Sequence, residues 1–200
     1  MKRPDNPEHS TTLLDDWIPS PDVKERFRTI VRAPAGLVMD VASEFDLQSI
    51  KLVRVMFWMR ERIMRVSPMS ARKRQGLLAD TKAMGWGTLI HESGKLVVCG
   101  AACQPWSGEV IFVPIIPSEF VNYSEPFRVK IAWTLEVESL GPELTRFSHE
   151  TRVVGTDEAA KKKFLRYWRW ARYGIISLRW ILLPAIRRAS KRRWAVEKTN

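Results

Sequence analysis

The chain has 200 residues, 45% of them hydrophobic, which is enough to bury the core of a single domain. Its formal net charge is +11, yet residues 1–160 hold 20 Lys and Arg against 21 Asp and Glu, so the excess lies in residues 161–200. With only two cysteines, Cys99 and Cys103, and three histidines, there is neither a disulfide framework nor a cluster at metal-ligand spacing. We therefore expect no metal and no cofactor, and two buried thiols in a reducing compartment.

The N-terminus is polar and proline-bearing, and it has no apolar stretch like that of a secretory signal peptide. We interpret residues 1–20 as a disordered or loosely attached segment, and we expect the protein to be cytoplasmic. Residues 21–189 would then form the domain, and residues 190–200 a basic tail.

The first half of the domain predicts one strand and two helices. Residues 22–32 alternate between apolar and charged positions, which is typical of a half-buried antiparallel strand. Pro34 suits a helix start, and apolar residues follow it at helical spacing. Residues 50–64 carry a methionine-rich apolar stripe at steps of three and four, which predicts a second helix. We interpret residues 67–82 as an irregular connection.

The next elements are short strands. The turn Ser93-Gly94 separates residues 89–92 from residues 95–102, and this arrangement predicts a hairpin. Residues 109–113 follow as a short strand, which ends because Pro114 breaks it.

Two long alternating runs, residues 127–138 and 144–154, predict a second hairpin in which each strand has a single buried face. The apolar face of the first run consists of Phe127, Val129, Ile131, Trp133, Leu135 and Val137. The matching face of the second run consists of Phe147, His149, Thr151 and Val153.

A long helix capped by Thr156 is the last predicted element. Its apolar stripe consists of Phe164, Trp168, Ala171, Ile175, Leu178 and Leu182. Pro184 is expected to kink or end it. The order of elements predicts an α+β fold in which a curved antiparallel sheet wraps around this helix, because a sheet with one apolar face needs a cover.

This order, with a few short words of sequence, resembles one superfamily. The words are Arg32-Ala33-Pro34-Ala35, Glu150-Thr151-Arg152-Val153, Thr156-Asp157, Phe164, Tyr167-Trp168 and Ile186-Arg187-Arg188. Over roughly residues 22–189 the chain resembles bacterial members of the START-like, polyketide-cyclase-related superfamily, often called SRPBCC. The resemblance implies a helix-grip fold, with two short helices after the first strand and a cavity for a lipid, sterol, polyketide or other apolar molecule. Members share no single catalytic motif, so it implies no catalytic residue.

We therefore expect the chain to bind an apolar or amphipathic small molecule in an internal cavity, as a carrier or sensor. The expected lining is Met56, Met59, Trp86, Ile131, Trp133, Phe147, His149, Thr151, Trp168 and Ile175. His149 and Thr151 would be polar handles in an apolar pocket. A core histidine satisfied by a neighbour, and tryptophans that only fill the core, are the commoner alternatives.

Enzymatic function is a second hypothesis, as a polyketide cyclase/aromatase-like or hydrolase-like enzyme using the same cavity. His149 would act as general base with an acid such as Glu92 as its orienter, although nothing in the spacing requires the two to meet. The residues favour binding over catalysis.

A peripheral membrane protein is the third hypothesis, because tryptophans interleave with arginines, Arg179 among them, along the last helix. The expected contacts to an anionic membrane are Arg169, Arg172, Arg187, Arg188, Lys191, Arg192 and Arg193. Alternatively, the apolar stripe packs on the sheet and the arginines point to water. We expect no nucleic-acid partner, because the basic excess is confined to one helix and its tail.

Overall fold

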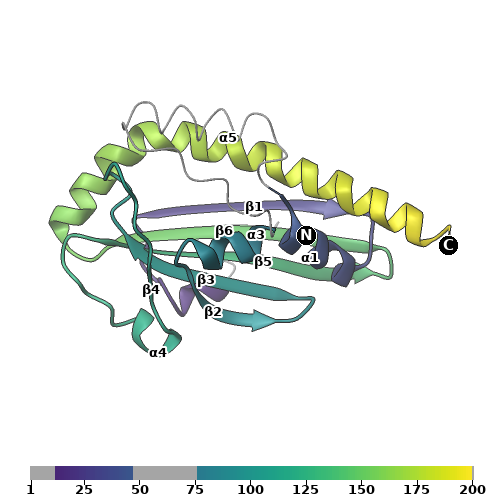
Figure 1. The fold of residues 1–200 in the computed structure, drawn as a ribbon, viewed down its shortest axis with the longest axis horizontal. Coiled ribbons are helices and arrows are strands. Elements are labelled where there is room, and N and C mark those ends of the chain that lie inside the picture. Colours follow the sequence, from purple (N-terminus) through teal and green to yellow (C-terminus); the bar gives the residue numbers. More distant parts are fainter. Residues whose placement is uncertain (1–11, 47–75, 200) are drawn as a thin grey trace, which may run out of the picture.

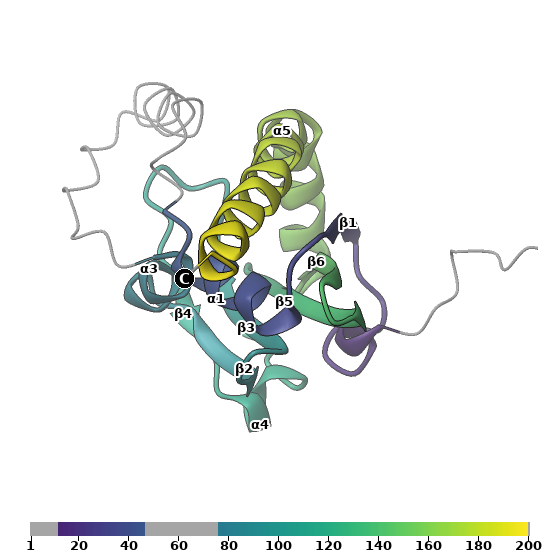
Figure 2. The same ribbon diagram turned by 90° about the vertical axis from the view of Figure 1, so that its right-hand side faces the viewer.

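The computed structural model describes residues 12–46 and 76–199. They form the predicted α+β fold: a curved, antiparallel six-stranded sheet with a 40-residue helix lying across one face (Figures 1 and 2). The strand order is β1-β6-β5-β3-β2, and β4 pairs with β3. In chain order the elements are η1 (Leu13–Asp15), β1 (Val23–Val31), α1 (Ala35–Glu44), α3 (Leu77–Ala83), β2 (Gly87–Glu92), β3 (Leu96–Cys103), β4 (Val113–Pro114), α4 (Pro117–Phe120), β5 (Val129–Gly141), β6 (Leu144–Gly155) and α5 (Glu158–Glu197).

Both predicted hairpins are confirmed. β2 and β3 pair across a turn in which Gly94 has a φ of +68°, a backbone conformation that favours glycine. β5 and β6 pair up to Gly141 and Leu144 at their turn. The first strand then pairs with the last, with Val23 opposite Val153, so β1 forms one edge of the sheet.

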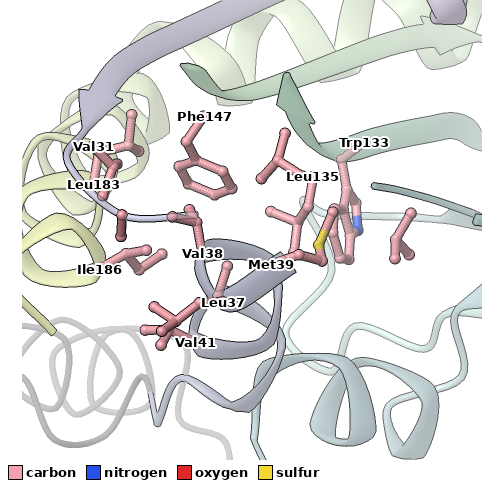
Figure 3. Packing of buried hydrophobic residues seen from close by; sticks show 14 of the residues in the cluster. Val31, Leu37, Val38, Met39, Val41, Trp133, Leu135, Phe147, Leu183 and Ile186 are labelled. Carbon is pink, nitrogen blue, oxygen red and sulfur yellow. The ribbon is translucent and has the colours of Figure 1, made fainter. Parts of the chain in front are cut away.

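The inner face of the sheet packs against α1 and α5. Phe147 and Trp133 project from the sheet, Val38 comes from α1, and Leu183 and Ile186 come from α5 (Figure 3). All five are buried. The strands therefore have the apolar inner parity that their alternation predicted.

The outer face is also covered, which corrects the prediction of a single buried face. Leu14 of η1 and Ile18, which follows η1, pack against this face together with Phe120 of α4. Their contacts on the sheet include Val98 and Ala132. The stretch from residue 12 to residue 20, expected to be loosely attached, is thus a cover for the sheet.

Buried charges hold this cover in place. Arg152, 1% exposed, projects from the outer side of β6, which the sequence predicted to face solvent. Its Nε donates to Glu150 at 2.7 Å, and its Nη1 donates to the carbonyl oxygen of Ile18 at 2.7 Å. Its Nη2 donates to the Thr12 hydroxyl and pairs with Asp15 at 2.7 Å. The polar parity of β6 is buried because the N-terminal segment supplies its partners.

Four predicted elements differ from the structure or fall outside it. The connection 67–82 is helical from Leu77, as α3. The strand predicted at 109–113 is only the two-residue β4, since β3 pairs with nothing earlier in that loop. Phe127 precedes β5 and has a φ of +61°. The predicted helix 50–64, with Met56 and Met59, lies outside the described residues.

α5 begins one residue later than predicted and does not end at Pro184. Asp157, not Thr156, is its cap, and accepts the backbone N–H of Ala160 at 2.6 Å. Pro184 lacks the N–H that would bond to the Trp180 carbonyl, and the packing of Leu183 and Ile186 against the sheet on either side of it offsets this loss. The residues expected as a tail continue the helix to Glu197.

Candidate functional site

The inward-facing side chains are buried near both ends of α5, and several beneath its middle are only half-buried. Phe147 and Ile186 are buried toward the C-terminal end, and Phe164 and Val153 are buried toward the N-terminal end. Between these clusters the inward-facing side chains of His149, Thr151 and Ile175 are half-buried, and Ile131 and Trp168 are half-buried beside the N-terminal cluster. Several side chains beneath the middle of α5 are therefore less deeply buried than those near its two ends.

A chain of hydrogen bonds links α5 to the sheet there. Arg179 Nη2 donates to Thr151 Oγ1 at 2.8 Å, and Thr151 Oγ1 lies 3.2 Å from His149 Nε2. The other ring nitrogen, His149 Nδ1, lies 2.7 Å from the Thr134 carbonyl oxygen. The Arg179 guanidinium also lies 5.4 Å from the centre of the Phe27 ring, a cation–π contact.

The chain ends where the ladder between β5 and β6 is interrupted. Between Trp133 and Glu136 of β5, no residue is paired with β6. The Thr134 hydroxyl accepts a hydrogen bond from the backbone N–H of Glu150 at 3.1 Å. The Thr134 carbonyl oxygen is the hydrogen-bond partner of His149 Nδ1. Side chains thus replace the missing backbone partners, and in doing so they fix the orientation of the imidazole.

The proton positions in this chain follow from its partners. A carbonyl oxygen only accepts, so His149 Nδ1 carries the proton. Burial and the nearby Arg179 charge lower the pKa of His149 to about 3, so the ring is neutral and Nε2 accepts the Thr151 hydroxyl. Thr151 Oγ1 in turn accepts from Arg179. A ring with both nitrogens engaged and so low a pKa is poorly suited to general-base catalysis.

Arg179 is the unusual member of the site. It is 9% exposed, and its burial lowers its pKa to about 10, although the Glu25 carboxylate partly offsets this. The guanidinium is still charged at neutral pH. Among the residues that the structure describes, no carboxylate forms an ion pair with it, and its Nη1 has no hydrogen-bond partner. A buried cation with an unsatisfied N–H is costly, which makes it a ready site for an oxygen atom of a ligand.

Of the eight predicted lining residues that the structure describes, Thr151 belongs to the hydrogen-bonded chain and Ile175 is half-buried on α5. The other six divide among three places. Trp86, Trp133 and His149 come together, with ring centroids 6.1 Å apart in each neighbouring pair. Phe147 belongs to the buried cluster of Figure 3. Ile131 and Trp168, partly buried, pack with the cluster near the start of α5.

The structure does not bring Glu92 to His149. Glu92 ends β2, on the far side of β3 and β5 from β6, where it is exposed and pairs with Lys95 at 3.0 Å. Cys99 is buried, and burial raises the pKa of its thiol to about 11, so it stays protonated. Within residues 12–46 and 76–199 no three His, Cys, Asp or Glu side chains are grouped to hold a metal ion.

The basic residues of α5 behave differently from one another. Arg169, Arg172, Arg187, Arg188 and Arg192 are exposed, and Lys191 is half-buried. Arg193 pairs with Glu44 at 3.0 Å and with Glu197 at 3.4 Å, so it is partly neutralised. No helix in the described part of the chain has an apolar stretch long enough to cross a bilayer.

Sequence reasoning placed Arg179 with the surface arginines, whereas the structure buries it. One signal could have identified it. Arg179 lies four residues from both Ile175 and Leu183, in a run that is otherwise apolar from Gly174 to Leu182 except for one serine. A single charge at the spacing of an inward stripe indicates a buried cation with a specific partner.

Comparison with known proteins adds little. No family model matches the chain, and no curated protein matches it. A crystal structure of a hypothetical protein from Helicobacter pylori is similar with a TM-score of 0.42 and 11% identity, covering 92% of this chain and 98% of the other. An aromatase/cyclase from Streptomyces sp. R1128 is similar with a TM-score of 0.30 and 11% identity, covering 86% and 94%. Similarities this weak bear on neither fold nor function, so SRPBCC membership stays a prediction.

Proposed function

We propose that the chain binds an amphipathic small molecule between the inner face of the sheet and the middle of α5, as a carrier or sensor. The apolar body of the ligand would lie against the half-buried inner side chains, and its oxygen-bearing head would contact Arg179. The observation that carries this proposal is the buried, unpartnered Nη1 of Arg179.

The head group follows from the charge of the site. The Arg179 guanidinium is a buried positive charge that no carboxylate of the described residues neutralises at ion-pair distance. The Glu25 carboxylate acts on it only from farther away. A carboxylate, or the carbonyl or enolate oxygen of a polyketide, would accept from Nη1 in a charge-assisted hydrogen bond. Such a bond to a charged group contributes about 1.5–3 kcal/mol, roughly a tenfold to hundredfold gain in affinity.

Aromatic rings supply the apolar side of the site. Trp86 stacks near Phe112 with ring centroids 4.8 Å apart and meets Trp133 edge-on at 6.1 Å. Trp86 remains half-buried, so part of this aromatic group is accessible to a ligand. Apolar walls with few polar groups are typical of small-molecule sites.

The catalytic alternative, a cyclase/aromatase-like or hydrolase-like enzyme, has less support. His149 is neutral with both nitrogens engaged, and Glu92 lies elsewhere. The remaining chemistry that the site offers is polarisation of a carbonyl by Arg179, which also suits plain binding.

Titration with a long-chain acid tests the proposal. The probe is dansyl-labelled undecanoic acid, compared with its methyl ester, monitored by fluorescence. We expect the acid to bind more tightly than the ester, and Arg179→Gln to weaken the acid by about tenfold or more while changing the ester little. Native mass spectrometry of gently purified protein would show whether a ligand is retained.

The matched control is Arg172→Gln, which removes an exposed arginine from the same helix. Its affinity for the acid should equal that of the wild type. Equal affinity of the wild type for acid and ester, or equal losses in the two variants, would reject Arg179 as the anchor. Absence of binding of either probe, together with a bare mass, would reject the binding function.

A further inference from the structure

The outward side of α5 exposes three large aromatic residues. Trp170 is 72% exposed, Tyr173 is 65% exposed and Trp180 is 72% exposed. The three lie three and seven residues apart, so they share one face of the helix. Soluble proteins rarely leave aromatics of this size so open to water without a partner.

Basic residues extend the same face in both directions. Arg166 and Arg169 lie on its N-terminal side, and Arg187 and Arg188 lie on its C-terminal side. All four are exposed, and none forms an ion pair with a carboxylate of the described residues. No Asp or Glu occurs between residues 159 and 196. We call these four arginines and the three aromatic residues the aromatic-basic face.

We propose that the aromatic-basic face docks the protein onto an anionic lipid bilayer, with α5 parallel to the membrane plane. Tryptophan and tyrosine rings favour the boundary between headgroups and acyl chains, because they combine an apolar ring with a polar N–H or O–H group. Arginines on both sides of the rings would contact lipid phosphates. This inference is separate from ligand binding, because it uses the opposite side of α5.

Within residues 12–46 and 76–199, no element covers this face. Leu183 and Ile186 hold the inward side of α5 on the sheet, so docking requires no rearrangement of the core. In Figure 2, α5 stands above the sheet with one side turned away from it. The surface is a single stripe along α5, which bends near its N-terminal end (Figure 1).

The charge distribution favours a membrane over nucleic acid. Residues 1–160 have 20 basic against 21 acidic side chains, so the body adds no net attraction for a polyanion. Single-stranded nucleic acid is usually held in a basic groove that follows the backbone. A bilayer needs only one basic, aromatic surface.

Vesicle co-sedimentation tests the inference. The probes are vesicles of phosphatidylcholine alone and of phosphatidylcholine mixed with phosphatidylglycerol. We expect the wild type to pellet with the mixed vesicles at low salt and to be largely released at about 1 M salt, where the Debye length is about 3 Å. Binding to the neutral vesicles should be much weaker.

Two variants separate the aromatic from the basic contribution. Trp170→Ala combined with Trp180→Ala should lower the vesicle partition coefficient about tenfold or more. Arg187→Gln combined with Arg188→Gln should lower it about fivefold for each charge removed. The control is Ile111→Ala with Ile116→Ala, two exposed apolar residues outside α5, and it should partition like the wild type. Circular dichroism confirms that every variant is folded.

Four results would overturn the inference. One is equal partitioning of the wild type and the tryptophan variant, and another is no preference for anionic vesicles. The third is failure of the protein to pellet with vesicles, together with binding to a labelled single-stranded oligonucleotide, measured by fluorescence anisotropy, that is lost when Trp170 and Trp180 are replaced. This result would assign the face to nucleic acid. Sedimentation velocity that shows a dimer lost in the tryptophan variant would assign it to a second copy of the chain instead.

Discussion

Replacing Arg152 with methionine tests whether the buried charges beneath the N-terminal segment hold the outer face together. Arg152 is 1% exposed and contacts Glu150, Asp15 and the carbonyl oxygen of Ile18. Methionine fills a similar volume but leaves Glu150, which is 3% exposed, with weaker partners. One of these weaker partners is Arg26, whose Nε lies 3.4 Å from the Glu150 carboxylate.

Removal of one partner of a buried ion pair costs about 3–5 kcal/mol, because the remaining charge is uncompensated. We therefore expect Arg152→Met to lower the free energy of unfolding by that amount. For a urea slope of about 2 kcal/mol/M, the midpoint would fall by about 1.5–2.5 M. Hydrogen exchange of residues 12–20 should accelerate as well, since these residues lose their anchor.

A second substitution checks the mechanism. Glu150→Gln removes the stranded charge, so the double variant with Arg152→Met should recover about 1–2 kcal/mol of the loss, a coupling typical of contacting residues. Arg146→Met is the control on the same strand, because its pair with Glu138 is exposed and is worth about 0–1 kcal/mol. A loss for Arg152→Met no larger than for Arg146→Met, or no recovery in the double variant, would refute the reasoning.

Two further predictions concern the sheet. Gly100→Ala should destabilise by about 1–3 kcal/mol, because a Cβ there would lie 2.6 Å from Phe120 and 2.7 Å from Leu89; a denaturation midpoint unchanged from the wild type would contradict this. His149, with a pKa lowered to about 3, should stay neutral and protonated on Nδ1 in ¹⁵N NMR spectra from pH 8 to pH 5. Its stabilising effect should fall as the pH drops below about 6.5, where the unfolded chain binds the proton first, and His149→Gln should flatten that part of the curve.

The secondary structure was predictable where the local sequence pattern determines whether a residue is buried or exposed. Period-two alternation identified β5 and β6, and glycine marked the turn at Gly94. The outer face was not predictable, because Glu150 and Arg152 have the spacing of solvated residues. The segment around Leu14, more than 130 residues earlier in the chain, buries them. Thr12 of that segment donates a hydrogen bond to Glu150, and the carbonyl oxygen of Ile18 accepts one from Arg152. Such pairing between distant segments leaves no periodic trace.

The site was partly predictable for the same reason. His149 and Thr151 were recognised because they interrupt an apolar parity of a strand, and the structure places both beneath α5. Arg179 was not, because the last helix is basic and aromatic throughout, and composition does not separate its two sides.

Arg179 and Trp180 show what composition conceals. They are adjacent in sequence, yet one is 9% exposed and the other 72% exposed, since successive residues on a helix point about 100° apart. Burial removes Arg179 from the surface charge, so the attraction of α5 for anions comes from its other arginines. Burial also strips Arg179 of water and leaves Nη1 unsatisfied, which is the basis for a specific contact with one oxygen atom. The same residue type therefore contributes nonspecific, salt-sensitive attraction on one side of α5 and directional recognition on the other.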